Sequence, residues 1–215
     1  MRNNLSPVAK EGLKYIGCST LLFAVFAILD FEILEFIAFF ALLFFVFIYR
    51  NPERTAIIYE KNSVVSPVDG VVLSIEEIDD KEYAYKIEIE NSFFDVAFLR
   101  VPFNSSLKSV NIKRGARLSK IGVLAKKINE HAELLFEDEN SNKMKVLHML
   151  KCSPDEITIG ISEGQNLLQS LRYGLMINGI TTLYLPQNFR LNIGVGQEIT
   201  ASESLIGYFL TDITH

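Results

Sequence analysis

The sequence predicts a mostly β domain that follows two N-terminal membrane helices. The chain has 215 residues, of which 49% are hydrophobic. The apolar residues are concentrated near the start, because nine of the 16 phenylalanines lie between Phe23 and Phe47. After Pro52, short runs with the two-residue period of strands alternate with turn residues, which is typical of a barrel or sandwich. The length fits one domain with an appendage, and the composition excludes a disordered, collagen-like or coiled-coil chain.

Residues 1–49 are predicted to form a membrane anchor of two helices, about 12–29 and 31–49. The uncharged runs 15–29 and 36–49 are each shorter than the roughly 20 residues of a spanning helix, but extension to those limits brings both close to it. Lysine and arginine flank the pair and three acidic residues lie between the runs, so both ends are expected in the cytoplasm. A hairpin that only dips into one leaflet is the alternative. A cleaved signal peptide is disfavoured, because no small-residue cleavage site follows.

Residues 50–215 are predicted to form the β domain on the cytoplasmic side. A first pair of strands is expected in 63–75, where Pro-Val-Asp-Gly supplies turn residues between two β-type runs. Helical periodicity is weak throughout. The other expected strands are 83–90, 93–101, 110–112, 132–136, 145–149, 156–161, 183–186, 190–195 and 206–209, and the two weak helical segments are 118–127 and 165–171.

Positive charge is segregated within the domain, although the whole chain has a net charge of −5. Residues 96–129 contain no acidic residue. The eight basic residues of this segment, here called the basic strip, are Arg100, Lys108, Lys113, Arg114, Arg117, Lys120, Lys126 and Lys127. Beside a membrane anchor, such a strip is expected to face anionic lipid headgroups. A solvated basic face without a ligand is the alternative, and nucleic acid is disfavoured because the domain is acidic overall.

The cysteine and histidine content argues against metal and disulfide chemistry. The chain has two cysteines, Cys18 in an apolar run and Cys152 far from it, which excludes a disulfide framework and a cysteine-based zinc site. Only three histidines are present, so a multi-histidine metal centre is not expected.

Five motifs, in order and at characteristic spacing, resemble the short bacterial phosphatidylserine decarboxylase proenzymes over essentially the whole chain. They are YRNPER at 49–54, SPVDGVV at 66–72, FDVAFLRVP at 94–102, NEH at 129–131, and RYGLMING at 172–179 followed by LYLP at 183–186. The resemblance implies a lipoyl-like β domain on the cytoplasmic face of the bacterial inner membrane. It also implies self-cleavage between a glycine and a serine, which turns the serine into a pyruvoyl group that decarboxylates phosphatidylserine through a Schiff base.

The residues that carry self-cleavage in the family are incomplete in this sequence. The family's aspartate corresponds to Asp69, but its histidine corresponds to Ala97 and its serine should follow Gly179, where Ile180 stands. This segment is one residue short, so the serine is either deleted or substituted. Thr181 is a weak substitute nucleophile. His148 can act as a base only if the fold brings it beside Gly179.

Two further departures weaken the match to the family. The family's Asn-Glu-Arg motif reads Asn129-Glu130-His131, and the glycines expected before the cleavage segment are missing from 148–152. Asp69 also has a structural reading, because aspartate is favoured in a Pro-x-Asp-Gly turn.

These losses predict a pseudoenzyme that is not cleaved but keeps the fold and a lipid-facing strip. Its expected partners are membrane phospholipids, with an active homologue as a further candidate, and a pyruvoyl group is expected only if self-cleavage is rescued. The alternative is an active decarboxylase with an unusual processing site, which converts phosphatidylserine to phosphatidylethanolamine and CO₂. A membrane-tethered adaptor without a lipid role is a third possibility.

Overall fold

The computed structural model of the chain describes residues 6–54, 57, 59–60, 62–120 and 122–210. Two compact units divide the chain, Met1–Glu53 and Arg54–His215. This division lies close to the boundary expected after residue 49.

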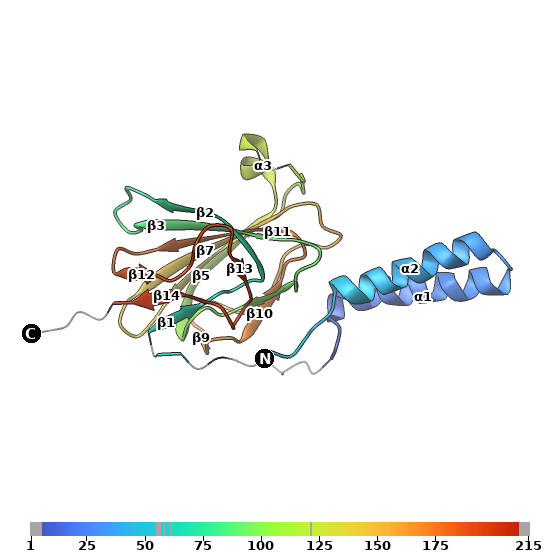
Figure 1. Cartoon of the computed structure of the whole chain (residues 1–215), viewed down its shortest axis with the longest axis horizontal. Helices are drawn as coiled ribbons and strands as arrows, with labels where there is room; N and C mark the ends of the chain where they lie inside the picture. Colours follow the sequence, from blue (N-terminus) through green and yellow to red (C-terminus); the bar gives the residue numbers. More distant parts are fainter. Residues whose placement is uncertain (1–5, 55–56, 58, 61, 121, 211–215) are drawn as a thin grey trace, which may run out of the picture. The chain divides into compact units, whose positions relative to one another are not determined.

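The N-terminal unit contains two helices that lie side by side and run in opposite directions (Figure 1). A short 3-10 helix, η1 (Lys10–Gly12), leads into α1 (Leu13–Ile28), and α2 (Glu32–Ile48) follows after three residues. The helices pack through aromatic rings, since the ring centroids of Tyr15 and Phe45 are 5.0 Å apart. Gly12 allows close approach, because a Cβ there would lie 2.4 Å from the Tyr49 ring.

Most of the apolar side chains of these helices remain exposed after the two have packed. Buried side chains are few, with Ser19 in α1 and Ala38 and Ile48 in α2. Among the described residues, one helical segment, Lys10–Ile28, is long and apolar enough to cross a membrane. The apolar helix α2 has 17 residues.

The C-terminal unit is built mainly from antiparallel strands, which confirms the mostly β class. The strands are β1 (Ser63–Val65), β2 (Gly70–Glu77), β3 (Tyr85–Asn91), β4 (Phe98–Arg100), β5 (Ser105–Lys113), β6 (His131–Glu137), β7 (Lys143–Leu150), β8 (Thr158–Ile159), β9 (Asn166–Leu167), β10 (Arg172–Leu175), β11 (Gly179–Leu185), β12 (Phe189–Leu191), β13 (Glu198–Ile199) and β14 (Leu205–Phe209). One short helix, α3 (Val123–Ile128), projects beyond the strands (Figure 1).

The described strands form one large sheet and two small ones. The large sheet has the order β13-β2-β3-β11-β7-β6-β5-β9, and the small sheets have the orders β1-β14-β12 and β4-β10-β8. Strand β11 lies at the centre of the large sheet, between β3 and β7, and each of its residues except Tyr184 is buried. The candidate cleavage segment therefore begins the central strand of the domain.

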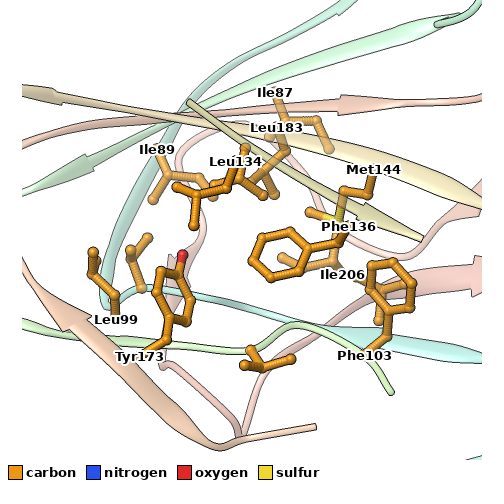
Figure 2. Close-up of a cluster of buried hydrophobic side chains, with 14 of the residues drawn as sticks. Ile87, Ile89, Leu99, Phe103, Leu134, Phe136, Met144, Tyr173, Leu183 and Ile206 are labelled. Atoms are coloured by element: carbon orange, nitrogen blue, oxygen red, sulfur yellow. The ribbon is translucent and has the colours of Figure 1, made fainter. Parts of the chain in front are cut away.

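All three sheets contribute side chains to one hydrophobic core (Figure 2). Ile87 of β3 and Leu134 of β6 come from the large sheet, while Tyr173 of β10 and Ile206 of β14 come from the small sheets. All four are fully buried. Burial of side chains this large contributes about 1.5–3 kcal/mol each, so the core holds the sheets in a fixed arrangement.

Two predicted elements are wrong. A continuous strand was expected over 93–101, but only β4 forms there. The Asp95 carboxylate accepts hydrogen bonds of 2.7 Å from both the backbone and the hydroxyl of Ser92, which folds 92–95 into a turn. The helix expected over 165–171 is replaced by β9 and a turn in which Ser170 has a φ of 69°.

Candidate processing site

The structure brings the predicted cleavage positions Asp69, Ala97 and Gly179 into one region. Asn91, at the end of β3, links two of them: its Nδ2 donates to the carbonyl of Asp69 at 3.1 Å, and its Oδ1 accepts from the backbone N–H of Asn178 at 3.3 Å. The carbonyl of Ala97 accepts from the backbone N–H of Met176 at 2.8 Å. Three segments far apart in the sequence therefore meet at the start of β11.

Both carboxylate oxygens of Asp69 are engaged in contacts that stabilise the fold. Oδ1 accepts from the backbone N–H of Ala201 at 2.8 Å. Oδ2 accepts from the Arg54 guanidinium at 2.5 Å and from the Val96 backbone N–H at 3.4 Å. The Asp69 residue is 8% exposed, so the guanidinium balances a nearly buried charge. These contacts join the β1–β2 turn to the segment before β4 and to the 200–204 loop.

The residues at the expected scissile bond are tightly enclosed. Asn178 has a φ of 106°, a conformation that side-chain-bearing residues rarely adopt. It is held there because its Nδ2 donates to the carbonyl of Cys152 at 2.7 Å and its carbonyl accepts from the Lys151 backbone at 3.0 Å. A Cβ on Gly179 would lie 2.5 Å from the Met149 carbonyl oxygen. Ile180 is 5% exposed and offers only an aliphatic side chain.

The nearest downstream hydroxyl, that of Thr181, belongs to a buried hydrogen-bond chain that connects the large sheet to a small one. The Thr181 hydroxyl lies 2.8 Å from Nδ1 of His148, and Nε2 of His148 lies 2.6 Å from the hydroxyl of Tyr173. All three side chains are fully buried, and Figure 2 shows the Tyr173 hydroxyl pointing into the core. Burial lowers the pKa of His148 to about 3, so its ring is neutral at pH 7.

The Thr181–His148–Tyr173 hydrogen-bond chain has one feature of an activated nucleophile and lacks others. A histidine nitrogen within hydrogen-bond distance of a hydroxyl is the usual arrangement for proton abstraction. The lowered pKa of His148 makes it a weak base, however, and burial keeps water away from Thr181. The sequence suggested Thr181 and His148 but not Tyr173, because a tyrosine in a short β-type run gives no sign of its partner across the core.

The Asn129-Glu130-His131 motif connects several segments of the fold through hydrogen bonds and ion pairs. The Glu130 carboxylate is 2% exposed and accepts a hydrogen bond of 2.9 Å from the Ile157 backbone. Arg114 forms an ion pair with one Glu130 oxygen and Arg117 lies 3.5 Å from the other. Asn129 connects the motif to the end of β7, since its Nδ2 donates to the carbonyl of Leu150 at 2.8 Å. The motif therefore holds the basic strip against the large sheet.

The structure changes the composition of the lipid-facing set expected from the sequence. Arg100 is 6% exposed and donates to the carbonyl of Ser170 at 3.2 Å, so its assignment to the lipid surface is wrong. Arg114 and Arg117 neutralise Glu130, and Lys108 lies 3.8 Å from Glu137.

Besides Lys127 of α3, two lysines of the basic strip remain exposed and unpaired among the described residues. Lys113 and Lys120 are exposed, and neither forms an ion pair within the described part of the chain. Residues 96–129 contain no acidic residue, but some of their basic side chains form ion pairs with carboxylates of other segments. Glu88 of β3, Glu137 of β6 and Glu156 before β8 are such partners.

The globular unit is thus a mostly β domain that follows two apolar helices, with the Asp69 turn beside the start of its central strand. A sequence model described as phosphatidylserine decarboxylase matches residues 41–207. The chain belongs to the phosphatidylserine decarboxylase family.

Curated relatives match the chain over nearly its full length. The phosphatidylserine decarboxylase proenzyme of Geobacter metallireducens is 32% identical over 216 residues, which cover 96% of this chain and 99% of the relative. The proenzymes of Geotalea uraniireducens and Desulfotalea psychrophila are 31% and 27% identical, and the alignments cover 96% and 95% of this chain and 99% and 97% of those relatives.

The residues present do not fit the pyruvoyl group on which the family depends. That group is formed from the serine that follows the cleaved glycine, after the serine hydroxyl has attacked the preceding carbonyl, and Ile180 holds this place on β11. The Thr181 hydroxyl points into the core instead, where it contacts His148. No catalytic step through a pyruvoyl group is therefore derived for this chain.

Proposed function

We propose that this chain is a pseudoenzyme of phospholipid metabolism, which remains uncut and retains the decarboxylase fold at a membrane surface. The observation that carries the proposal is the pair Ala97 and Ile180. The methyl group of Ala97 cannot accept a proton, and Ile180 has no atom that can attack a carbonyl. Removal of members of a catalytic triad costs several orders of magnitude in rate, and single restorations recover little because the members act as a unit.

Retention of Asp69 is compatible with this proposal. Its carboxylate is bonded to Arg54 and to two backbone N–H groups, so the fold alone gives a reason to keep it. The 24.3 kDa chain is thus expected to behave as a single folded polypeptide without a pyruvoyl cofactor.

We further propose that the N-terminal unit anchors the protein as a two-helix hairpin in the bacterial inner membrane, with the globular unit on the cytoplasmic side. Support comes from the exposed apolar side chains of α1 and α2 and from the acidic residues at their connection. For the globular unit we propose a lipoyl-like sandwich, on the basis of a core shared between the large sheet and the two small ones.

The proposed partner of the globular unit is an anionic lipid surface, with Lys113 and Lys120 as its exposed contacts from the expected set. An active homologue is a further proposed partner, to which an uncut chain would contribute the shared fold.

A second candidate function, an active decarboxylase, is favoured by one contact, the 2.8 Å separation of His148 Nδ1 and Thr181 Oγ1. In that case cleavage would occur before Thr181 rather than after Gly179. The buried and weakly basic His148 makes this the less supported candidate.

Activity and carbonyl labelling in vesicles separate the two candidates. The full chain and the Geobacter metallireducens relative, as the positive control, are each reconstituted with phosphatidylserine and probed with a hydrazide. The pseudoenzyme proposal expects no CO₂ and no labelled fragment from this chain. Release of CO₂ together with a labelled C-terminal fragment, both abolished in Thr181→Val, would establish the active alternative.

A further inference from the structure

The short helix α3 exposes an apolar surface that the globular unit does not cover. Val123, Leu124 and Ile128, here called the α3 tip, are 77%, 61% and 43% exposed. Ala125 of the same helix is 1% exposed, so α3 packs by one side only. Exposed aliphatic side chains are common singly, but three adjacent ones on a projecting helix (Figure 1) indicate a contact surface.

The position of the α3 tip is fixed by contacts of the second half of the helix and of the residue that follows it. Residues three or four apart share a helix face, so Leu124 and Ile128 lie next to each other. Lys126 reaches from α3 to Glu88 of β3 at 3.5 Å. Asn129, directly after the helix, hydrogen-bonds to both the backbone N–H and the carbonyl of Leu118, at 3.1 and 3.0 Å. The apolar side is therefore presented outward by the fold.

Exposed lysines lie on α3 and in the segment that precedes it. Lys127 lies on the helix itself, Lys120 precedes it, and Lys113 ends β5. All three are exposed, and none forms an ion pair among the residues that the structure describes. The nearest carboxylates are already engaged, since Glu130 is buried in ion pairs with Arg114 and Arg117 and Glu88 contacts Lys126 and Lys86. Exposed apolar side chains accompanied by unpaired lysines match the chemistry of an anionic bilayer surface, where the apolar side chains enter the headgroup boundary and the cations contact phosphate.

We infer that the α3 tip inserts into the headgroup region of an anionic membrane as a contact separate from the N-terminal helices. The inference rests on the proposed membrane-bound role and names the element that makes the lipid contact. Each lysine near an anionic surface favours contact by about fivefold, so reversal of two is expected to shift the contact equilibrium at least about 25-fold.

A fluorescent probe on the α3 tip of the full chain tests this inference. Cys18 and Cys152 are replaced by serine, Leu124→Cys carries an environment-sensitive dye, and the protein is reconstituted into vesicles with a nitroxide on the lipid chains. Val195→Cys is the matched control, since Val195 is an apolar residue 63% exposed in a turn of the same unit. We expect a blue shift and quenching at Leu124, but not at Val195, in phosphatidylglycerol vesicles and not in pure phosphatidylcholine.

Charge reversal and salt decide whether lipid is the occupant. Lys120→Glu with Lys127→Glu should remove most of the shift, and high salt should do the same because exposed charges are screened. A Leu124 probe that remains in water in both vesicle types would overturn the inference. A shift that depends on the protein-to-lipid ratio but not on lipid charge would also overturn it, and would identify a second copy of the chain as the partner of the α3 tip. Whether the chain is cut is read from its mass, so this inference and the pseudoenzyme proposal can each fail alone.

Discussion

The buried imidazole of His148 should make the globular unit sensitive to mild acid. Its pKa is lowered from 6.5 to about 3 by burial, while in the unfolded chain it returns to the ordinary value. Between these two values the unfolded state binds one more proton than the folded state. Stability from this group is therefore complete above pH 6.5 and is lost progressively as the pH falls from 6.5 toward 3. Between pH 7 and pH 5, His148 alone should cost about 2 kcal/mol of unfolding free energy.

Urea titrations of the full chain in mild detergent, followed by circular dichroism and tyrosine fluorescence, measure this loss. His148→Gln removes the titrating ring but keeps groups that can donate to and accept from Thr181 and Tyr173. Between pH 7 and pH 5, the free energy of unfolding should fall by about 2 kcal/mol less in this variant than in the wild type, whatever the substitution does to stability at pH 7. His131→Gln is the control, since it removes a histidine of the same unit that takes no part in the Thr181–His148–Tyr173 chain. Parallel curves for wild type and His148→Gln would refute the buried neutral imidazole.

Three other sets of substitutions test the remaining positions of the site. Thr181→Val should destabilise the protein by about 1–3 kcal/mol, because it leaves Nδ1 of the buried His148 without its partner; an unchanged urea midpoint would contradict that contact. Arg54→Met should cost about 3–5 kcal/mol, because it leaves the Asp69 carboxylate nearly buried beside backbone donors alone, and Arg54→Met combined with Asp69→Asn should recover part of the loss in a thermal melt. Ala97→His together with Ile180→Ser should begin to restore self-cleavage on a denaturing gel, whereas either change alone should not, and cleavage by one of the single variants would show that the two positions are independent.

The fold class and several strands could be predicted from the sequence because they depend on local patterns. Alternation over 132–136 and 145–149 matches β6 and β7, whose registers place one face of each strand in the core. The strand predicted over 93–101 failed because a single carboxylate, Asp95, bonds to Ser92 and turns the chain. A period of two does not report such a side-chain contact.

The candidate site was predictable in its positions but not in its bonding. The motif resemblance named Asp69, Ala97 and Gly179, and the structure gathers them around Asn91 and Met176. The environment of the basic strip was not predictable, because sequence spacing does not show that Glu130 and Glu156 lie within ion-pair distance of its arginines.

Contacts across the core were equally hidden from the sequence. Tyr173 and His148 face each other from different sheets, and such a pairing depends on how the sheets stack. A short β-type run carries information about which face of a strand is buried, but none about which strand lies opposite.

The intact mass of the full-length protein, purified from membranes under denaturing conditions, tests the central claim most directly. The account predicts one species at the mass of the whole 24.3 kDa chain, with no loss of its C-terminal part. Cleavage after Gly179 would release residues 180–215, about one sixth of the chain and roughly 4 kDa. A C-terminal fragment of that size with a carbonyl-reactive N-terminus, in the unmodified protein, would contradict the account and identify a working decarboxylase.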